Sequence, residues 1–162
     1  FHTIDSRLFR DRIVRLYHTY SIAANQKMLN LLDSHDTDRF LTRVKGDAGR
    51  FRTAAAIMFF NPGIPCVYYG DEIGMEGGYD PDCRRTFEWN EENWDKDTRN
   101  LIKQLMKLKK GPALSDGDFG VEEKDGIITF TRSADKQTIK LRVNGTPRVK
   151  KGLEAYGFEI IM

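Results

Sequence analysis

The sequence predicts an α/β fold in which helices alternate with short buried strands, followed by a small antiparallel β-domain. Up to about residue 111, segments with helical periodicity alternate with short apolar runs, the pattern of a parallel sheet or barrel. From about residue 113 only short strand-like runs remain, with turn dipeptides between them. We therefore place a domain boundary between residues 111 and 112, with a β-sandwich-like domain over 112–162.

The first predicted helix begins near Asp5 or Ser6, because either side chain can cap the free N–H groups of a first turn. An apolar stripe at helical spacing follows, made of Phe9, Ile13, Leu16, Tyr17 and Tyr20. After the polar residues 25–27, Met28 to Leu32 predicts a short buried strand, although so short a run is also compatible with a buried helical segment.

The second predicted helix follows Asp47, a suitable N-cap, and is stopped by Asn61-Pro62-Gly63. Its stripe consists of Phe51, Ala54, Ala55, Met58 and Phe59. The run from Cys66 to Tyr69 then predicts a strand that is buried on both faces. A long loop from Gly70 to about Trp94 follows, and loops of this length in compact domains are usually functional or disordered.

The third predicted helix runs from about Asp95 to Lys110 and is stopped by Gly111-Pro112. Its inward-facing residues are Leu101, Ile102, Leu105 and Leu108. In the tail, apolar residues that alternate with polar ones predict strands at Ile128, Phe130, Ile139, Leu141 and Val143. Asp125-Gly126 and Asn144-Gly145 are dipeptides that favour tight turns, so we expect a hairpin at each.

Composition and charge favour a globular protein without a nucleic-acid or membrane partner. The net charge of +2 does not provide the concentrated basic face that such partners need, and the basic stretch Lys103–Lys110 indicates the solvated face of an amphipathic helix. No apolar run approaches the roughly 20 residues that span a bilayer. The two cysteines, Cys66 and Cys83, have no metal-ligand spacing and favour reduced thiols in a cytoplasmic protein. Because the sequence opens on Phe1, we expect a fragment whose N-terminal signal, if any, lies outside it.

Polar residues follow directly after the first predicted strand, in the segment Asp33-Ser34-His35-Asp36-Thr37. In a parallel α/β barrel the carboxyl ends of the strands form the active-site face, so His35 and Asp36 are candidate active-site residues. Residue types alone favour another interpretation, a turn in which Asp36 bonds to the backbone and His35 is incidental.

Other chemistries for this segment find little support. A metal site needs more ligands, and the remaining histidines are His2, near the start, and His18, inside the first predicted helix. A Ser-His-Asp triad is disfavoured because Ser34 and His35 are adjacent, so their side chains diverge in extended chain.

Two further clusters carry charged side chains. Gly63 to Gly74 is a strand that leads into Asp71 and Glu72, and it lacks the glycine spacing and the lysine of a phosphate-binding loop. In the segment Asp80–Arg85 two aspartates could hold calcium, but the loop fails the residue count and glycine position of an EF-hand. A surface loop of ion pairs is the alternative for that segment.

In this order, the three clusters resemble the end of the α-amylase family of glycoside hydrolases, most closely its cyclomaltodextrinases, neopullulanases and maltogenic amylases. The segment 31–37 is similar to the family motif at barrel strand 7, and 63–72 is similar to the motif at strand 8. The segment 80–85 is similar to a loop of the cyclomaltodextrinase-like subgroup. The resemblance spans about residues 4–110, and the tail resembles the family's C-terminal β-domain in position and style.

This resemblance implies that residues 1–111 are the C-terminal part of a catalytic (β/α)8 barrel, from helix 6 to helix 8 with strands 7 and 8. It also implies retaining hydrolysis of α-glucosidic bonds, for which a nucleophile and an acid about 5–5.5 Å apart flank the bond. In the family these two carboxyl groups lie at strands 4 and 5, which precede this chain. We therefore expect the chain alone to be inactive.

The resemblance also implies roles for individual residues. Asp36 would be the catalytic carboxylate that stabilises the transition state, and the substrate-binding residues would be His35, Asp80 and Arg84. Asp71 and Glu72 would serve structural hydrogen bonding at the barrel rim, while Asp38 departs from the family, since many relatives have proline there. No cofactor and no metal ligand is assigned, and calcium, possible in the parent enzyme, is not supported here. The expected partner is an α-glucan or maltooligosaccharide.

Two alternatives stay open at this point. A non-catalytic carbohydrate-binding or assembly module would use stacking aromatics such as Tyr79, Phe87 or Trp89, and Asp36 would be dispensable. A transglycosylase of the same family would differ in whether water or a sugar attacks the intermediate, which upstream residues largely decide. An isolated part of a barrel also exposes apolar faces, so we expect self-association or non-native packing of the first helix.

Overall fold

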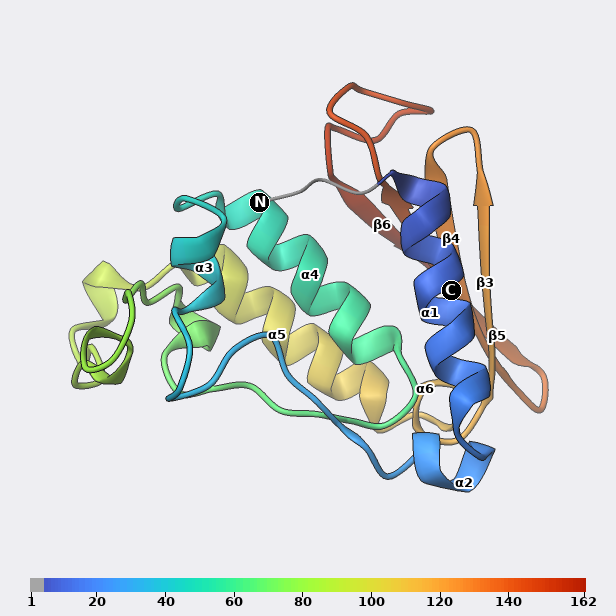
Figure 1. Cartoon of the computed structure of the whole chain (residues 1–162), viewed down its shortest axis with the longest axis horizontal. Helices are drawn as coiled ribbons and strands as arrows, with labels where there is room; N and C mark the ends of the chain where they lie inside the picture. The colour runs from blue at the N-terminus through green and yellow to red at the C-terminus, as the bar shows by residue number, and fades with distance from the viewer. Residues whose placement is uncertain (1–4) are drawn as a thin grey trace.

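A computed structural model describes residues 5–162, so that His2 lies outside the described residues. Helices α4 and α5 lie side by side in the middle of the molecule, and an antiparallel sheet stands to one side with α1 along it (Figure 1). The α-helices are α1 (Ser6–Thr19), α2 (Ile22–Asn25), α3 (Phe40–Arg43), α4 (Ala48–Phe60), α5 (Lys96–Lys109) and α6 (Pro112–Ser115). Among the helices described, none is long and apolar enough to cross a membrane.

Residues 5–162 contain two separate sheets. A parallel pair is formed by β1 (Leu29–Asn30) and β2 (Ile64–Pro65). An antiparallel meander, in the order of the chain, is formed by β3 (Asp118–Lys124), β4 (Ile127–Ala134), β5 (Gln137–Asn144) and β6 (Phe158–Ile161). The long loop between β2 and α5 carries three short 3-10 helices, η1 (Asp71–Ile73), η2 (Asp82–Arg84) and η3 (Glu91–Asn93).

The three long helices begin where the sequence predicts, because an aspartate caps each of them. The Asp5 carboxylate accepts a hydrogen bond from the Leu8 N–H at 2.7 Å. Asp47 and Asp95 accept equivalent bonds at the starts of α4 and α5, each at 3.0 Å. An N-cap of this kind contributes roughly 1 kcal/mol by satisfying an otherwise free donor.

Helix α4 is more deeply buried than its predicted stripe. Its buried residues are Phe51, Thr53, Ala55, Ala56, Met58, Phe59 and Phe60. One hydrophobic cluster joins this helix to Leu105 of α5 and to Phe130 and Leu141 of the antiparallel sheet. The core is therefore continuous across the predicted boundary between residues 111 and 112, and the boundary itself stays a prediction.

The outer surfaces of α1 and α5 differ from the simplest prediction at a few positions. Leu16 and Tyr20 of the predicted α1 stripe are 57% and 51% exposed, while Phe9 and Ile13 pack against the core. In the basic stretch of α5, the Lys109 ammonium donates to the carbonyl oxygens of Phe59 and Asn61, at 3.2 Å each. Burial lowers the pKa of Lys109 to about 8.

Both short strands differ from their predictions. The predicted strand Met28–Leu32 is reduced to β1, with Leu29 63% and Leu31 49% exposed. The predicted strand Cys66–Tyr69 is wrong, because the strand is β2, and of the predicted run only the Cys66 N–H donates to β1, to the Asn30 carbonyl at 2.7 Å. Ile64 of β2 is 51% exposed. The apolar runs indicate strands of a covered sheet, whereas among residues 5–162 β1 and β2 pair only with each other.

One of the two predicted tight turns is confirmed. Asp125 and Gly126 have φ values of 56° and 84°, and positive φ at both positions is what a two-residue type I′ turn requires. The hairpin predicted at Asn144-Gly145 is wrong, since β5 ends at Asn144 and β6 begins only at Phe158.

Asn144 organises the intervening loop instead of turning the chain. Its side chain is fully buried, and its amide nitrogen lies 2.7, 3.2 and 2.9 Å from the carbonyl oxygens of Arg148, Leu153 and Glu154. Its amide oxygen accepts from the Thr146 N–H at 3.0 Å. A residue type that is typical of turns is thus used here as a buried hydrogen-bonding centre.

We expect the Asn144→Ala substitution to lower the free energy of unfolding by about 2–3 kcal/mol, because it leaves buried backbone carbonyls without a donor. Urea unfolding followed by circular dichroism measures the change. Asn100→Ala, at an exposed position of α5, is the matched control and should change stability by less than about 0.5 kcal/mol. A loss in Asn144→Ala no larger than that of the control would contradict this role.

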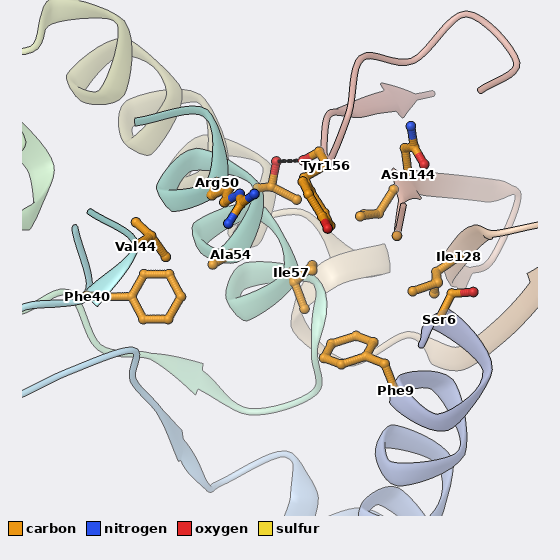
Figure 2. Close-up of a pocket in the computed structure, with 13 residues that line it drawn as sticks. Ser6, Phe9, Phe40, Val44, Arg50, Ala54, Ile57, Ile128, Asn144 and Tyr156 are labelled. Carbon is orange, nitrogen blue, oxygen red and sulfur yellow. Dashed lines mark hydrogen bonds between the residues drawn. The ribbon is translucent and has the colours of Figure 1, made fainter. Parts of the chain in front are cut away.

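A cavity of about 250 Å³ lies where α1, α4 and the antiparallel sheet meet (Figure 2). Its walls are largely apolar, with Phe9 and Ile57 facing it from the two helices. On one side the Arg50 guanidinium lies 4.3 Å from the centroid of the Tyr156 ring, and the Thr53 hydroxyl donates to the Tyr156 carbonyl at 2.7 Å. None of the predicted site residues lines this cavity. The contacts of Arg50 and Thr53 with Tyr156 connect α4 to the loop before β6 at its edge.

Candidate active site

The loop that follows β1 presents His35 and Asp36 to solvent. The side chains are 59% and 69% exposed, and His35 Nε2 lies 3.2 Å from Asp36 Oδ1. A local turn shapes this loop, since the Ser34 hydroxyl accepts from the Asp36 N–H at 3.2 Å and the Thr37 hydroxyl accepts from the Ser34 N–H at 3.1 Å. Ser34 and Thr37 therefore supply the side-chain atoms of the turn, which leaves the Asp36 carboxylate facing outward.

The other two predicted site residues meet this pair across the long loop. Arg84 Nε lies 2.8 Å from Asp80 Oδ1, and Arg84 Nη2 lies 3.6 Å from Asp36 Oδ1. Arg84 Nε also donates to the His35 carbonyl at 3.1 Å, and so does the Cys83 thiol at 3.2 Å. The structure thus brings His35, Asp36, Asp80 and Arg84 into one cluster, which we call the candidate site.

The aspartates of the long loop are engaged in ion pairs. Asp82 accepts from Arg85 Nε and from the Gly78 N–H, both at 2.6 Å. These two hydrogen bonds, first that of Arg85, lower the pKa of the Asp82 carboxyl. Within residues 5–162 no group of three or more His, Cys, Asp or Glu side chains is placed to hold a metal ion.

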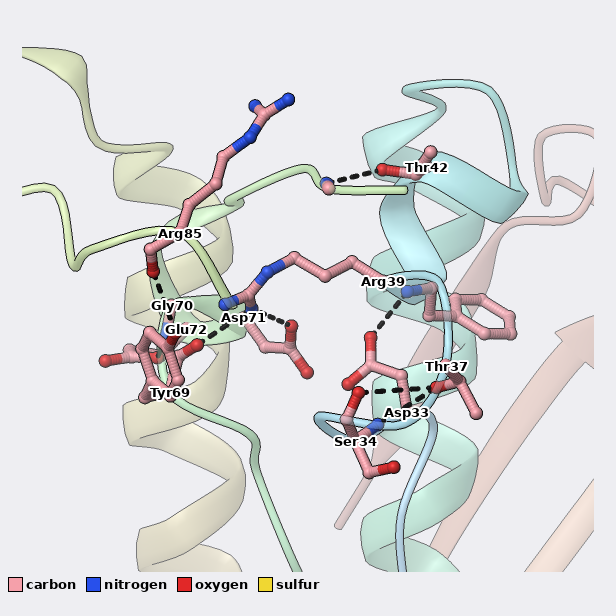
Figure 3. A network of polar contacts seen from close by, with 12 residues as sticks. Asp33, Ser34, Thr37, Arg39, Thr42, Tyr69, Gly70, Asp71, Glu72 and Arg85 are labelled. Carbon is pink, nitrogen blue, oxygen red and sulfur yellow. Dashed lines mark hydrogen bonds and ion pairs between the residues drawn. The ribbon is translucent and has the colours of Figure 1, made fainter. Parts of the chain in front are cut away.

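A buried polar network lies close to the candidate site (Figure 3). The guanidinium of Arg39 is fully buried, and its Nη1 donates to the Tyr69 carbonyl at 2.8 Å and to Asp71 Oδ1 at 3.2 Å. It lies 4.6 Å and 4.9 Å from the ring centroids of Tyr68 and Tyr69. Asp33 is also buried, and its carboxylate accepts from the N–H of Phe40.

The pKa values of Asp71 and Tyr68 are raised in this network. Burial raises the pKa of the Asp71 carboxyl to about 8, and the neighbouring Asp33 carboxylate adds to this effect while Arg39 opposes it. Burial and a hydrogen bond with Tyr69 raise the pKa of Tyr68 to about 12. Burial beside Asp33 thus favours the protonated form of the Asp71 carboxyl.

Sequence reasoning missed Arg39 altogether. Arg39 directly precedes the four-residue helix α3, and no periodicity or spacing in the sequence marks an arginine at that position as buried. The one available signal was its position three residues after Asp36, close to a segment already singled out. By contrast, Asp71 and Glu72 have the structural hydrogen bonds that the resemblance implies, Glu72 accepting from the Gly70 N–H at 2.7 Å.

The aromatic residues considered for sugar stacking are strongly exposed. Tyr79, directly before Asp80, is 74% exposed, and Trp89 is 81% exposed. Phe87 and Trp89 meet edge to face with ring centroids 4.7 Å apart, and Phe87 also contacts Trp94 at 6.1 Å. Phe87 and Trp89 thus form an aromatic pair on the loop before η3, whereas Tyr79 lies next to the candidate site in the sequence.

Comparison with known proteins identifies relatives of this chain. The family profile described as "Alpha amylase, catalytic domain" matches residues 6–114. A cyclomaltodextrinase of a Bacillus species is 40% identical over 129 residues, covering 77% of this chain and 23% of the relative. An intracellular maltogenic amylase of Bacillus subtilis is 40% identical over 121 residues, covering 72% and 21%. A cyclomaltodextrinase of Thermoanaerobacter pseudethanolicus is 41% identical over 147 residues, covering 90% and 26%.

Solved structures give the same result. The maltogenic amylase from S. marinus superimposes with a TM-score of 0.89 at 30% identity, covering 97% of this chain and 25% of that chain. The cyclic α-maltosyl-(1→6)-maltose hydrolase from Arthrobacter globiformis superimposes with a TM-score of 0.88 at 28% identity, covering 98% and 40%. The helices and the antiparallel sheet thus agree with part of a barrel enzyme that carries a small β-domain.

These relatives are glycoside hydrolases, which defines the class of enzyme to which the fold of this chain corresponds. The chain belongs to the alpha-amylase family, whose catalytic-domain profile matches it over residues 6–114. It spans about a quarter of the length of the curated relatives that it matches.

Proposed function

We propose that the chain is the C-terminal part of a retaining α-glucan hydrolase that acts on cyclomaltodextrins, pullulan or maltooligosaccharides. The observation that carries the proposal is the candidate site, in which His35, Asp36, Asp80 and Arg84 lie together although 48 residues separate Asp36 from Arg84. The names of the relatives, cyclomaltodextrinase, maltogenic amylase and neopullulanase, supply the substrate class.

The chemistry of the candidate site fits this reaction. Glycoside hydrolysis passes through an oxocarbenium-like transition state, and Asp36 places an exposed carboxylate where that positive charge develops. His35 hydrogen-bonds the same sugar, and its contact with Asp36 holds the two side chains together. Asp80 and Arg84 contact the substrate further along the cleft.

In the complete enzyme, β1 and β2 are strands 7 and 8 of the barrel, and α1, α4 and α5 are helices 6, 7 and 8. Residues 112–162 are the C-terminal β-domain. The nucleophile and the general acid lie on strands outside this chain, so the chain alone does not hydrolyse glucosidic bonds. The support for this is the short share of each relative that the chain covers.

A chimeric enzyme tests the proposal. In the cyclomaltodextrinase of Thermoanaerobacter pseudethanolicus, the segment that matches this chain is replaced by residues 6–162, because the match covers 90% of this chain. The chimera is expected to hydrolyse β-cyclodextrin, measured as released reducing ends, while the purified 162-residue chain releases none. Turnover by the chain alone, or a folded but inactive chimera, would contradict the proposal.

The exposed faces of β1 and β2 also predict self-association of the isolated chain. Leu29, Leu31 and Ile64 are each about half exposed or more, and adjacent apolar side chains of this kind are normally covered. Sedimentation velocity of the purified chain should therefore show oligomers, and Leu31→Glu should shift the distribution toward monomer. A monodisperse monomer of the unsubstituted chain would argue against this expectation.

We also propose that the parent enzyme is cytoplasmic. The support is the Bacillus subtilis relative, which is named an intracellular maltogenic amylase. Cell fractionation of the source organism, with antibodies against this chain, tests the proposal, and recovery from the culture medium would contradict it.

A further inference from the structure

We propose that Arg39 is a positioning residue for the candidate site. It holds the loop of residues 31–39, which carries His35 and Asp36, against the loop of residues 69–78, which leads to Asp80 and Arg84. The inference rests on the proposed function, because positioning has a catalytic meaning only if Asp36 acts on substrate.

The side chain of Arg39 makes the first part of this connection. Its guanidinium crosses from one loop to the other, and Nη1 binds both the carbonyl oxygen of Tyr69 and the carboxyl of Asp71 (Figure 3). The flat group lies against two tyrosine rings, 4.6 Å and 4.9 Å from their centroids. A planar, fully buried group fixed by two acceptors and two rings leaves little freedom to the loop that bears it.

The backbone beside Arg39 makes the second part of the connection. The Arg39 N–H donates to the Gly77 carbonyl at 2.9 Å, and the Gly77 N–H donates to the Thr42 hydroxyl at 2.8 Å. Both the N–H and the carbonyl oxygen of Gly77 are therefore hydrogen-bonded to residues 39–42. Because these bonds are local in space but join residues about 35 positions apart, they fix the two loops relative to each other.

Gly77 in turn packs closely against η2. A Cβ atom at Gly77 would lie 2.6 Å from the Asp82 carbonyl oxygen and 3.0 Å from the Cys83 Cα, so the glycine backbone lies directly on η2. The Asp82 carboxylate also accepts from the Gly78 N–H at 2.6 Å. Residues 77 and 78, which follow the segment that Arg39 contacts, thus pack directly against η2.

Arg84, the last residue of η2, contacts the loop of residues 31–39. Its Nε donates to the His35 carbonyl, and its Nη2 faces the Asp36 carboxylate at 3.6 Å. The loop is therefore fixed at two places, at Arg39 by residues 69–77 and at His35 by η2. Displacement of a catalytic group by about 1 Å can lower a rate by about a hundredfold, so a weaker attachment at Arg39 has a direct catalytic cost.

Arg132 offers a matched comparison for Arg39. It is also fully buried, and it too binds carbonyl oxygens, those of Phe60 at 3.1 Å and Gly117 at 3.0 Å. It lies on β4, in the antiparallel sheet, and contacts none of the residues of the candidate site. Comparing substitutions of the two arginines therefore distinguishes an effect on stability from an effect on the positioning of the candidate site.

The experiment compares Arg39→Lys with Arg132→Lys in the chimeric enzyme. Lysine keeps the charge and a donor for the Tyr69 carbonyl and Asp71, but its ammonium is not planar and cannot lie flat against the two tyrosine rings. We expect kcat on β-cyclodextrin to fall about 10- to 100-fold in Arg39→Lys. KM should change less than about 3-fold, because the lost contact matters more in the transition state than in the ground state. Arg132→Lys should lower the melting temperature similarly, with kcat within about 2-fold of the unsubstituted chimera.

A milder variant keeps the proposal open to contradiction if Arg39→Lys does not fold. Thr42→Val removes only the hydroxyl that accepts from Gly77, and we expect it to lower kcat about 3- to 10-fold at nearly constant KM. An unchanged kcat in either folded variant, or an equal loss in Arg132→Lys, overturns the positioning role. Asp36→Asn distinguishes the two proposals, because full turnover in that variant contradicts the proposed function, whereas its inactivity beside an unchanged Arg39→Lys contradicts only the role of Arg39.

Discussion

Asp36→Asn in the chimeric enzyme is expected to lower kcat on β-cyclodextrin by about a hundredfold to a thousandfold, the usual cost of removing one group that stabilises transition-state charge. Asparagine keeps the shape and hydrogen-bonding capacity of the side chain but removes the charge that, in the proposed mechanism, faces the developing oxocarbenium ion. Because Asp36 is 69% exposed and lies on a loop, the substitution should leave the melting temperature nearly unchanged. Steady-state kinetics together with a thermal unfolding curve measure both quantities.

Asp38→Asn is the matched control for this substitution, since it neutralises a carboxylate two residues away on the same loop. Its kcat should stay within about 3-fold of the unsubstituted chimera. If both variants lose activity equally, loop charge in general would explain the effect. If Asp36→Asn keeps more than about a tenth of the turnover, the role of Asp36 in the transition state is wrong.

Asp71→Asn is expected to change the pH dependence of stability more than any other single acidic substitution in the network. The pKa of Asp71 is raised to about 8 from its ordinary value of 3.8, mainly by burial and then by Asp33. A carboxyl whose pKa is raised on folding contributes stability that is complete below about pH 4 and is lost as the pH rises toward 8. The chain should therefore lose stability over that range relative to Asp71→Asn, by up to about 1.4 kcal/mol per pH unit.

Urea unfolding at several pH values between 4.5 and 8 measures this difference. Glu122→Gln is the control, because it removes an exposed carboxylate of β3 and should give a curve parallel to that of the unsubstituted chain. Parallel curves for Asp71→Asn and the unsubstituted chain would show that the Asp71 carboxyl is ionised throughout, contrary to its burial beside Asp33.

The elements that could be predicted from the sequence are those whose determinants are local. An aspartate cap and an apolar stripe define α4 and α5, and two residues that tolerate positive φ define the turn at Asp125-Gly126. The two short strands were placed less well, because their apolar runs indicate burial, whereas among residues 5–162 β1 and β2 pair only with each other and are partly exposed. The hairpin predicted at Asn144-Gly145 failed for a related reason. The dipeptide is typical of a turn, but the buried Asn144 side chain donates to backbone carbonyls of the following loop.

The candidate site was predicted from resemblance rather than from physics. On residue types alone Asp36 favoured a turn, and nothing in the spacing of Asp80 and Arg84 indicates that they meet it. The structure brings the four residues together, while their roles stay proposals. The burial of Arg39 could not be predicted from residue types or from the resemblance. Its acceptors and the tyrosine rings lie on a loop about 30 residues away, and only the folded structure shows that they meet it.

Cys83 makes the contact between the two loops directly observable. Its side chain is fully buried, and its thiol donates to the His35 carbonyl at 3.2 Å. The sequence has only one other cysteine, Cys66, which is exposed and can be replaced by serine. The rate at which a thiol reagent then labels Cys83 reports how often the loop of residues 31–39 leaves η2. We expect a maltooligosaccharide bound at the candidate site, as proposed, to slow the labelling, so that its occupancy could be followed without any turnover.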